Sequence, residues 1–244
     1  MKKLILLTLL FIVGCVNSTE PEDYCNGKSN NKYEFIDGSC YYKPDLEFIQ
    51  DFENDCGLPY NYGGEEYLDD IDGLYWNSNL RIRKINFKYE SLTCEIPESI
   101  GNLTELEQLW LSYNQLYGEI PASFNNLTKL ERLSLHDNNF TGSIENIVNL
   151  TSIYWMSLSY NQFSGEIPEG IGDLTNIKVL LLHNNQLSGT IPESICNLEH
   201  LVWSSEFSDN PYDSNSYIFN NHLCPPYPEC LPESSIGEQD NSNC

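Results

Sequence analysis

The chain has 244 residues, and its 36 acidic residues outnumber its 12 lysines and arginines to give a formal net charge of −24. Binding to nucleic acid requires basic side chains that neutralise phosphates, so this charge argues against a nucleic-acid partner. It argues equally against adsorption of the protein surface to anionic lipid.

The first 24 residues are typical of an export signal followed by a short tether. Two lysines precede an apolar run that is too short to remain in a bilayer as a spanning helix. The run ends in the letters I-V-G-C at Cys15, which resembles a bacterial lipobox. The resemblance implies that residues 1–14 are removed and that Cys15 is lipidated, with residues 15–24 as the tether; several acyl chains would anchor it stably. The alternative is a plain secretory signal in which Cys15 has no role.

Residues 25–80 are expected to form an N-terminal cap of mixed structure. Apolar residues recur at helical spacing after Pro44, so the sequence predicts a short helix over 44–53, with the proline in its first turn. Residues 74–76 are expected to pack on the element that follows.

A pattern of about 24 residues recurs through residues 81–199. Its core is L-x-x-L-x-L-x-x-N-x-L, and a fixed period of this length with this spacing is the signature of a leucine-rich repeat. We number the first leucine of each copy as position 0, so that the asparagine stands at position 8. The five copies span residues 81–104, 105–128, 129–151, 152–175 and 176–199.

The longer motif L-x-G-x-I-P, followed by an apolar residue and N-L-T, resembles the plant-type leucine-rich repeat. That type occurs in plant receptor ectodomains, in polygalacturonase-inhibiting proteins and in bacterial surface proteins. The resemblance implies an α/β repeat solenoid: a right-handed superhelix with a concave parallel β-sheet, and with 3-10 or short helices on its convex side. It implies a binding role, and it does not identify a ligand.

Two copies depart from the pattern. Glu90 replaces the asparagine in the first copy, and Glu145 replaces the proline in the third copy, which is also one residue short. A buried amide at position 8 can satisfy backbone groups of adjacent coils, and the first coil lacks one neighbour, so Glu90 is tolerable there. Near Glu145 we expect a local irregularity and no break in the solenoid. The asparagine column comprises Asn114, Asn138, Asn161 and Asn185.

Residues 200–244 are expected to form a C-terminal cap, because the pattern frays after residue 199 and several prolines stop regular structure. Eight cysteines remain besides Cys15, and an even number predicts four disulfides formed outside a reducing compartment. The open ends of a solenoid need capping, and most of these cysteines lie there. Proximity along the chain predicts the pairs Cys25–Cys40, Cys56–Cys94, Cys196–Cys244 and Cys224–Cys230.

The candidate binding surface is the concave sheet. Because strand residues alternate between faces, positions 2, 4 and 6 of each copy point outward, and stacking aligns them. Aromatic side chains among small serines have the composition of a recognition surface; the alternative is that a few exposed aromatics on strands need no explanation. The candidate residues are Trp110, Tyr113, Arg132, His136, Trp155, Tyr160, Leu181, His183 and Trp203.

A second feature is a group of basic residues on the first repeat strand, in a chain that is otherwise acidic. These residues either neutralise the acidic N-terminal cap or meet an acidic ligand. They are Arg81, Arg83, Lys84 and Lys88.

The sequence predicts a non-catalytic protein without a metal or a cofactor. His136 and His183 share a column but stand two coils apart, roughly 10 Å, which is too far for joint metal binding. No nucleophile elbow, glycine-rich phosphate loop or zinc-protease motif occurs.

We therefore interpret the chain as a monomeric, exported protein, lipid-anchored at the outer membrane or surface of a bacterial cell, or alternatively secreted. It would bind another protein or a glycan through its concave face. One alternative is an inhibitor of a secreted hydrolase, as the resemblance to the plant inhibitors implies. Another is a structural or adhesive envelope protein without a discrete ligand.

Overall fold

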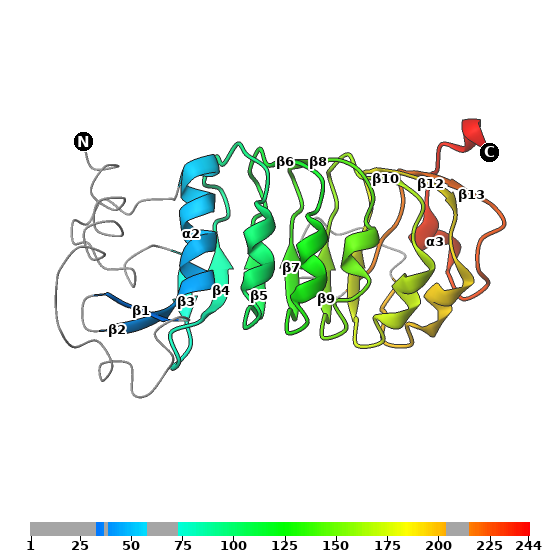
Figure 1. Ribbon diagram of the computed structural model, residues 1–244. Coiled ribbons are helices and arrows are strands. Elements are labelled where there is room, and N and C mark those ends of the chain that lie inside the picture. The colour runs from blue at the N-terminus through cyan, green and yellow to red at the C-terminus, as the bar shows by residue number, and fades with distance from the viewer. Residues whose placement is uncertain (1–32, 37–38, 58–72, 204–214) are drawn as a thin grey trace, which may run out of the picture.

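The computed structural model describes residues 33–36, 39–57, 73–203 and 215–244. They form an elongated solenoid whose coils stack side by side along its length, from helix α2 (Lys43–Cys56) to helix α3 (Glu233–Ile236) (Figure 1). The predicted signal peptide, the lipidated Cys15 and the tether lie outside the described residues. Among the helices within those ranges, none combines the length and the apolar character that a bilayer crossing requires.

One six-stranded sheet runs the length of the repeats. Its order is β11-β9-β7-β5-β4-β3; neighbours from β4 to β11 are parallel, and β3 pairs antiparallel with β4. Residues 74–76 thus pack on the first repeat, as predicted. The strands are β3 (Leu74–Trp76), β4 (Ile82–Asn86), β5 (Gln108–Trp110), β7 (Arg132–Ser134), β9 (Trp155–Ser157) and β11 (Val179–Leu181).

Each coil returns to the sheet through a 3-10 helix, which lies in front of the sheet in Figure 1. Proline precedes every one of these helices except η5, which Ile144 precedes and which has three residues instead of five. This is the local irregularity predicted near Glu145, and the solenoid continues through it. The helices are η3 (Glu98–Asn102), η4 (Ala122–Asn126), η5 (Glu145–Ile147), η6 (Glu169–Asp173) and η7 (Glu193–Asn197).

Short second strands follow the turns of the second to sixth coils and pair in parallel in two groups, β6 with β8, and β10 with β12 and β13. They are β6 (Tyr117–Gly118), β8 (Asn139–Phe140), β10 (Ser164–Gly165), β12 (Gln186–Thr190) and β13 (His222–Cys224). Between these strands, the sheet and the 3-10 helices lies one continuous apolar core, in which the leucines at positions 0, 3, 5 and 10 of the second copy are at most 1% exposed.

The asparagine column joins each coil to its neighbours, as predicted. Asn138 Nδ2 donates to the carbonyl of Leu111 in the preceding coil at 2.9 Å and to that of Leu135 in its own coil at 3.0 Å. Its Oδ1 accepts the N–H of Leu116 at 3.0 Å. The same three-way bridge recurs at Asn114, Asn161, Asn185 and Asn221.

Helix α2 covers the open N-terminal end of the core. It extends beyond the predicted 44–53 at both ends, with proline in its first turn, and buries an apolar face on which Phe52 meets Phe87 of the first coil at 5.6 Å. Strands β1 (Tyr33–Ile36) and β2 (Ser39–Tyr42) form an antiparallel hairpin before it.

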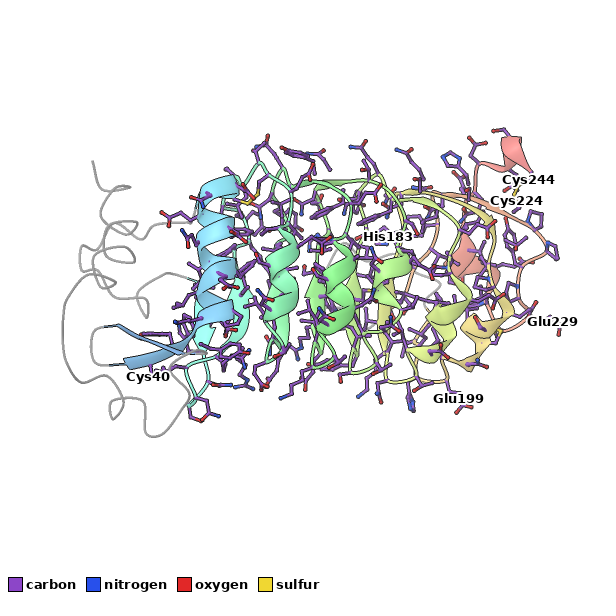
Figure 2. The ribbon with its side chains drawn as sticks, viewed as in Figure 1. Cys40, His183, Glu199, Cys224, Glu229 and Cys244 are labelled. Atoms are coloured by element: carbon purple, nitrogen blue, oxygen red, sulfur yellow. A yellow bond between two sulfur atoms is a disulfide. The ribbon has the colours of Figure 1, made fainter. Side chains whose placement is uncertain are left out.

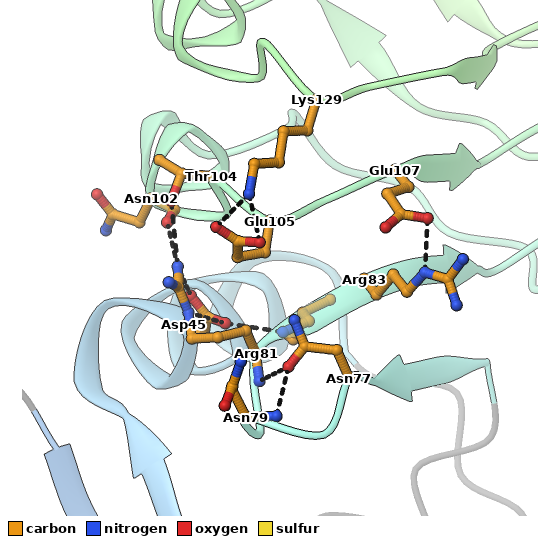
Figure 3. A network of polar contacts seen from close by, with 11 residues as sticks. Asp45, Asn77, Asn79, Arg81, Arg83, Asn102, Thr104, Glu105, Glu107 and Lys129 are labelled. Carbon is orange, nitrogen blue, oxygen red and sulfur yellow. Dashed lines mark hydrogen bonds and ion pairs between the residues drawn. The ribbon is translucent and has the colours of Figure 1, made fainter. Parts of the chain in front are cut away.

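A buried ion pair fixes α2 on the first coil (Figure 3). The Asp45 side chain is 0% exposed, and Arg81 donates to its two carboxylate oxygens from Nε and a terminal nitrogen, each at 3.0 Å. The N–H of Ile82 donates to the same carboxylate at 2.8 Å. Of the four basic residues on this strand, Arg81 therefore neutralises the N-terminal cap internally, whereas Arg83 pairs with Glu107 of the next coil at 2.5 Å.

The C-terminal cap contains most of a sixth coil, interrupted by an insertion. Asn221 follows Asn185 by 36 residues instead of about 24, and Ile218 and Leu223 occupy the buried positions before and after it. Trp203 and Ser216 meet through an isolated parallel bridge, so residues 204–215 are inserted between them. After β13 follow α3 and η8 (Asn241–Asn243).

The disulfides confirm one predicted pair and correct two. Cys56 bonds to Cys94 as predicted, and Cys40 is disulfide-bonded, while its predicted partner Cys25 lies outside the described residues. The pairs Cys196–Cys244 and Cys224–Cys230 are wrong, because the bonds are Cys196–Cys230 and Cys224–Cys244 (Figure 2). The final segment returns to β13, where the N–H of Asp240 donates to the carbonyl of Asn221 at 2.8 Å, so Cys244 reaches Cys224.

We expect Asn138→Ala to lower the free energy of unfolding by about 3 kcal/mol or more, because the buried N–H of Leu116 loses its partner and the carbonyls of Leu111 and Leu135 each lose one of two amide donors. The exposed neighbour Asn139 provides a matched control: Asn139→Ala should change the free energy of unfolding by less than about 0.5 kcal/mol. Urea unfolding followed by circular dichroism measures both. Equal effects of the two substitutions would contradict the structural role of the column.

Candidate ligand-binding face

The outward positions of successive coils are aligned across the sheet, as the repeat predicts. Strand pairing sets five position-2 residues side by side: Lys84, Gln108, Arg132, Trp155 and Val179. The position-4 residues align in the same way: Asn86, Trp110, Ser134, Ser157 and Leu181. Together with position 6, these columns define the concave face.

The predicted site residues are less exposed than the alternation of faces implies. Four are buried: Trp110 is 9% exposed, His136 5%, Leu181 7% and His183 4%. Outward side chains in adjacent coils cover one another, so pointing away from the core does not mean contact with water. Tyr160 is exposed, and the remaining four are half-buried: Tyr113, Arg132, Trp155 and Trp203.

In the first coils, aromatic rings support cationic groups. The ammonium of Lys88 lies 4.0 Å from the ring centroid of Trp110, and that of Lys84 lies 4.5 Å from the ring of Tyr75 on β3. Trp110 also meets Trp155 at 5.3 Å, across two strands. Trp110 therefore lies between Lys88, which covers one face of its ring, and Trp155.

Arg132 lies in the next part of the same cluster. Its Nε donates to the Tyr154 hydroxyl, and its guanidinium carbon lies 5.1 Å from the centroid of that ring. Because pairing places Arg132 beside Trp155, the cationic and aromatic side chains are contiguous over four strands.

An edge of tyrosines borders the concave face at position 7. Here the backbone is left-handed in every coil: φ is +61° at Tyr89, +58° at Tyr113 and +53° at Tyr160, and aspartate or asparagine takes the same position in the other coils. Asparagine and aspartate tolerate this conformation, whereas a bulky side chain is an outlier there. The rings of Tyr89 and Tyr113 stack at 4.3 Å. Burial, with a contribution from Tyr89, raises the pKa of Tyr113 to about 12.

The C-terminal half of the face is apolar. Val179, Leu181 and Tyr217 form a separate buried cluster, against which Trp155 and Phe219 pack. Tyr217 and Phe219 were missed in the sequence, although counting back from Asn221 gives their positions 4 and 6. Trp203 packs against the main core instead of joining these rings.

Aromatic rings surround His183, whereas His136 meets the ring of Tyr113 at 4.6 Å. His183, labelled in Figure 2, lies 4.9 Å from Phe219 and 5.3 Å from Tyr160 between ring centroids. Burial, followed by repulsion from His136, lowers its pKa to about 4. His136 contacts Asp137 at 2.8 Å. In the part of the chain that the structure describes, no three His, Cys, Asp or Glu side chains are grouped so that they could hold a metal ion.

Comparison with known proteins identifies the repeats. A two-copy leucine-rich repeat family model matches residues 104–149, and a single-copy leucine-rich repeat model matches 152–174 and 176–198. No curated protein matches the chain.

Three solved structures are similar along most of the chain. The ectodomain of the receptor kinase SOBIR1 from Arabidopsis thaliana has a TM-score of 0.57 and 29% identity, over 66% of this chain and 90% of its own. The BIR3–SERK2 complex from the same plant has a TM-score of 0.59 and 29% identity, and the match covers 76% of this chain and 98% of the other. A plant ice-binding protein has a TM-score of 0.62 and 25% identity, and the match covers 75% of this chain and 57% of the other. Longer plant receptors also match, and the chain spans 19% to 32% of their length.

We expect the free energy of unfolding to fall as the pH decreases from about 6.5 to about 4, because His183 takes up a proton more readily in the unfolded chain. The contribution of this histidine is on the order of 3 kcal/mol. His183→Gln should remove that part of the decline, and His200→Gln, at an exposed site, should leave it intact. Urea unfolding at several pH values tests this, and parallel curves for parent and His183→Gln would contradict it.

Proposed function

The chain is a leucine-rich repeat protein with the fold of plant receptor ectodomains, and on that premise we propose that it is a non-catalytic recognition protein. It binds another protein through its concave face. Two similar structures support this proposal: one is a receptor ectodomain, and the other is the complex of BIR3 with SERK2.

The observation that carries the proposal is the tyrosine edge. Three coils hold a tyrosine in a left-handed conformation where asparagine would fit with less strain. A bulky side chain costs roughly 1 kcal/mol there, and such outliers concentrate at functional sites. Tyr89 and Tyr160 are 68% and 42% exposed, so their rings are available to a partner.

A protein partner is favoured over a glycan because Trp110 is buried. A sugar ring stacks on an open aromatic face, but Lys88 covers one face of Trp110 and Trp155 lies against it. Exposed tyrosine edges with half-buried polar and cationic side chains between them suit a peptide surface better. Inhibition of a secreted hydrolase would be one form of such binding.

Export and anchoring are part of the proposal. Three disulfides among the described residues are typical of proteins that fold outside the reducing cytosol. We propose that residues 1–14 are a signal peptide and that lipidated Cys15 holds the protein at the cell envelope. Residues 25–80 and 200–244 would act as caps for the repeats at 81–199, and the protein would act as a monomer.

A photo-crosslinking amino acid at position 113 or 160 should capture a discrete protein on cells of the native host. The same amino acid at position 117 should capture none, because Tyr117 is equally exposed but lies on β6, outside the concave face. Mass spectrometry of the adducts identifies the partner. Capture from position 117 alone, or equally from all three positions, would contradict binding through the concave face.

The double variant Tyr113→Asn, Tyr160→Asn provides a second test. We expect it to lower affinity for the captured partner at least tenfold while leaving the free energy of unfolding unchanged or raised, since asparagine relieves the strain. Tyr117→Asn is the control. Titration calorimetry and urea unfolding measure the two quantities, and unchanged affinity would contradict a binding role for these tyrosines.

A further inference from the structure

The concave face differs in charge from the rest of the molecule. Positions 2, 4 and 6 of the first five coils supply fifteen residues, three from each coil, and none is aspartate or glutamate. The chain as a whole has three acidic residues for each basic one, 36 against 12. The same fifteen positions nevertheless hold three permanent cations, Lys84, Lys88 and Arg132.

Each of these three cations lies against an aromatic ring. Lys84 lies over Tyr75, Lys88 over Trp110 and Arg132 over Tyr154. Within the described residues, neither Lys84 nor Arg132 forms an ion pair. An aromatic ring orients a cation without neutralising it, so the positive charge remains available to an anion.

Four carboxylates flank the face at positions 1, 7 and 8 of these coils, and two of them contact a basic side chain. Glu107, at position 1, pairs with Arg83 at 2.5 Å, and Asp137, at position 7, contacts His136 at 2.8 Å. Glu131 and Glu90 flank the face at positions 1 and 8. Burial, followed by the charge of Lys84, lowers the pKa of Lys88.

We propose that the first three coils of the concave face bind an acidic segment of the partner protein, whose carboxylates meet Lys84, Lys88 and Arg132. This inference rests on the proposed function and specifies the chemistry of its ligand. The two ends of the cationic zone, Lys84 and Arg132, are two strands apart, which is about 10 Å. An extended chain advances by about 3 Å per residue, so two acidic residues separated by two others span the zone.

The net charge of −24 does not prevent this interaction. At physiological ionic strength the screening length is about 8 Å, so distant carboxylates of the protein are largely screened, while cations in contact with the ligand are not. Affinity should therefore fall between about 0.15 M and 0.5 M salt, as the local contacts are screened in turn.

Fluorescent 12-residue peptides test the inference by anisotropy on the full-length protein. One peptide repeats the unit Glu-Gly-Tyr, which places a glutamate at every third residue. A second replaces each glutamate by glutamine, and a third by lysine. We expect the glutamate peptide to bind at least tenfold more tightly than either analogue. Equal binding of the glutamate and glutamine peptides, or no binding by any of them, would overturn the inference.

Matched charge variants locate the site. The double variant Lys84→Gln, Lys88→Gln should weaken binding of the glutamate peptide at least tenfold. The control is the double variant Lys129→Gln, Lys178→Gln, which makes the same charge change at exposed positions outside the face and should leave binding unchanged. Equal loss in both double variants would show a nonspecific charge effect and overturn the site. If position 113 still crosslinks to a host protein while the peptides fail, the acidic ligand is wrong and the proposed function stands. If crosslinking fails as well, the proposed function is also wrong.

Discussion

The rest of the structure depends on one repeated interaction, the buried side-chain amide that bridges adjacent coils. A solenoid turn leaves backbone groups without partners, and each asparagine satisfies two carbonyls and one N–H at once. The bridge fixes the register of each coil against the next, and fixed register turns positions 2, 4 and 6 into continuous columns. The alignment of the outward side chains into one concave face thus follows from a constraint inside the core.

Where the columns hold large side chains, the face becomes a layer of its own. Trp110, Trp155 and Lys88 pack together in the first half, and Val179, Leu181 and Tyr217 pack in the second. This layer holds the cations in place without cancelling their charge. The left-handed tyrosines at its edge repeat a strained backbone conformation in three coils, and the asparagines and aspartate of the other coils show the less strained choice.

The features that the sequence predicts correctly are those that depend on the repeat: the coils, the asparagine bridges, the irregularity near Glu145 and the alignment of the outward positions. These follow from periodicity and local geometry, which act on neighbouring residues. The predicted C-terminal disulfide pairs are wrong because the path from Cys224 to Cys244 depends on the packing of a non-repetitive segment. The expectation that Trp110, His136 and His183 are exposed is also wrong. The alternation of faces along a strand predicts the direction of a side chain, but it does not predict which neighbouring side chains cover it.

Hydroxyl-radical footprinting of the full chain, with and without the captured partner, tests the central claim most directly, because it reports the exposure of many aromatic rings in one sample. Binding through the concave face predicts that oxidation of Tyr89, Tyr113 and Trp155 falls while that of Tyr117 is unchanged. Protection of Tyr117, with no change at the other three, would contradict the account and place the partner on a different face.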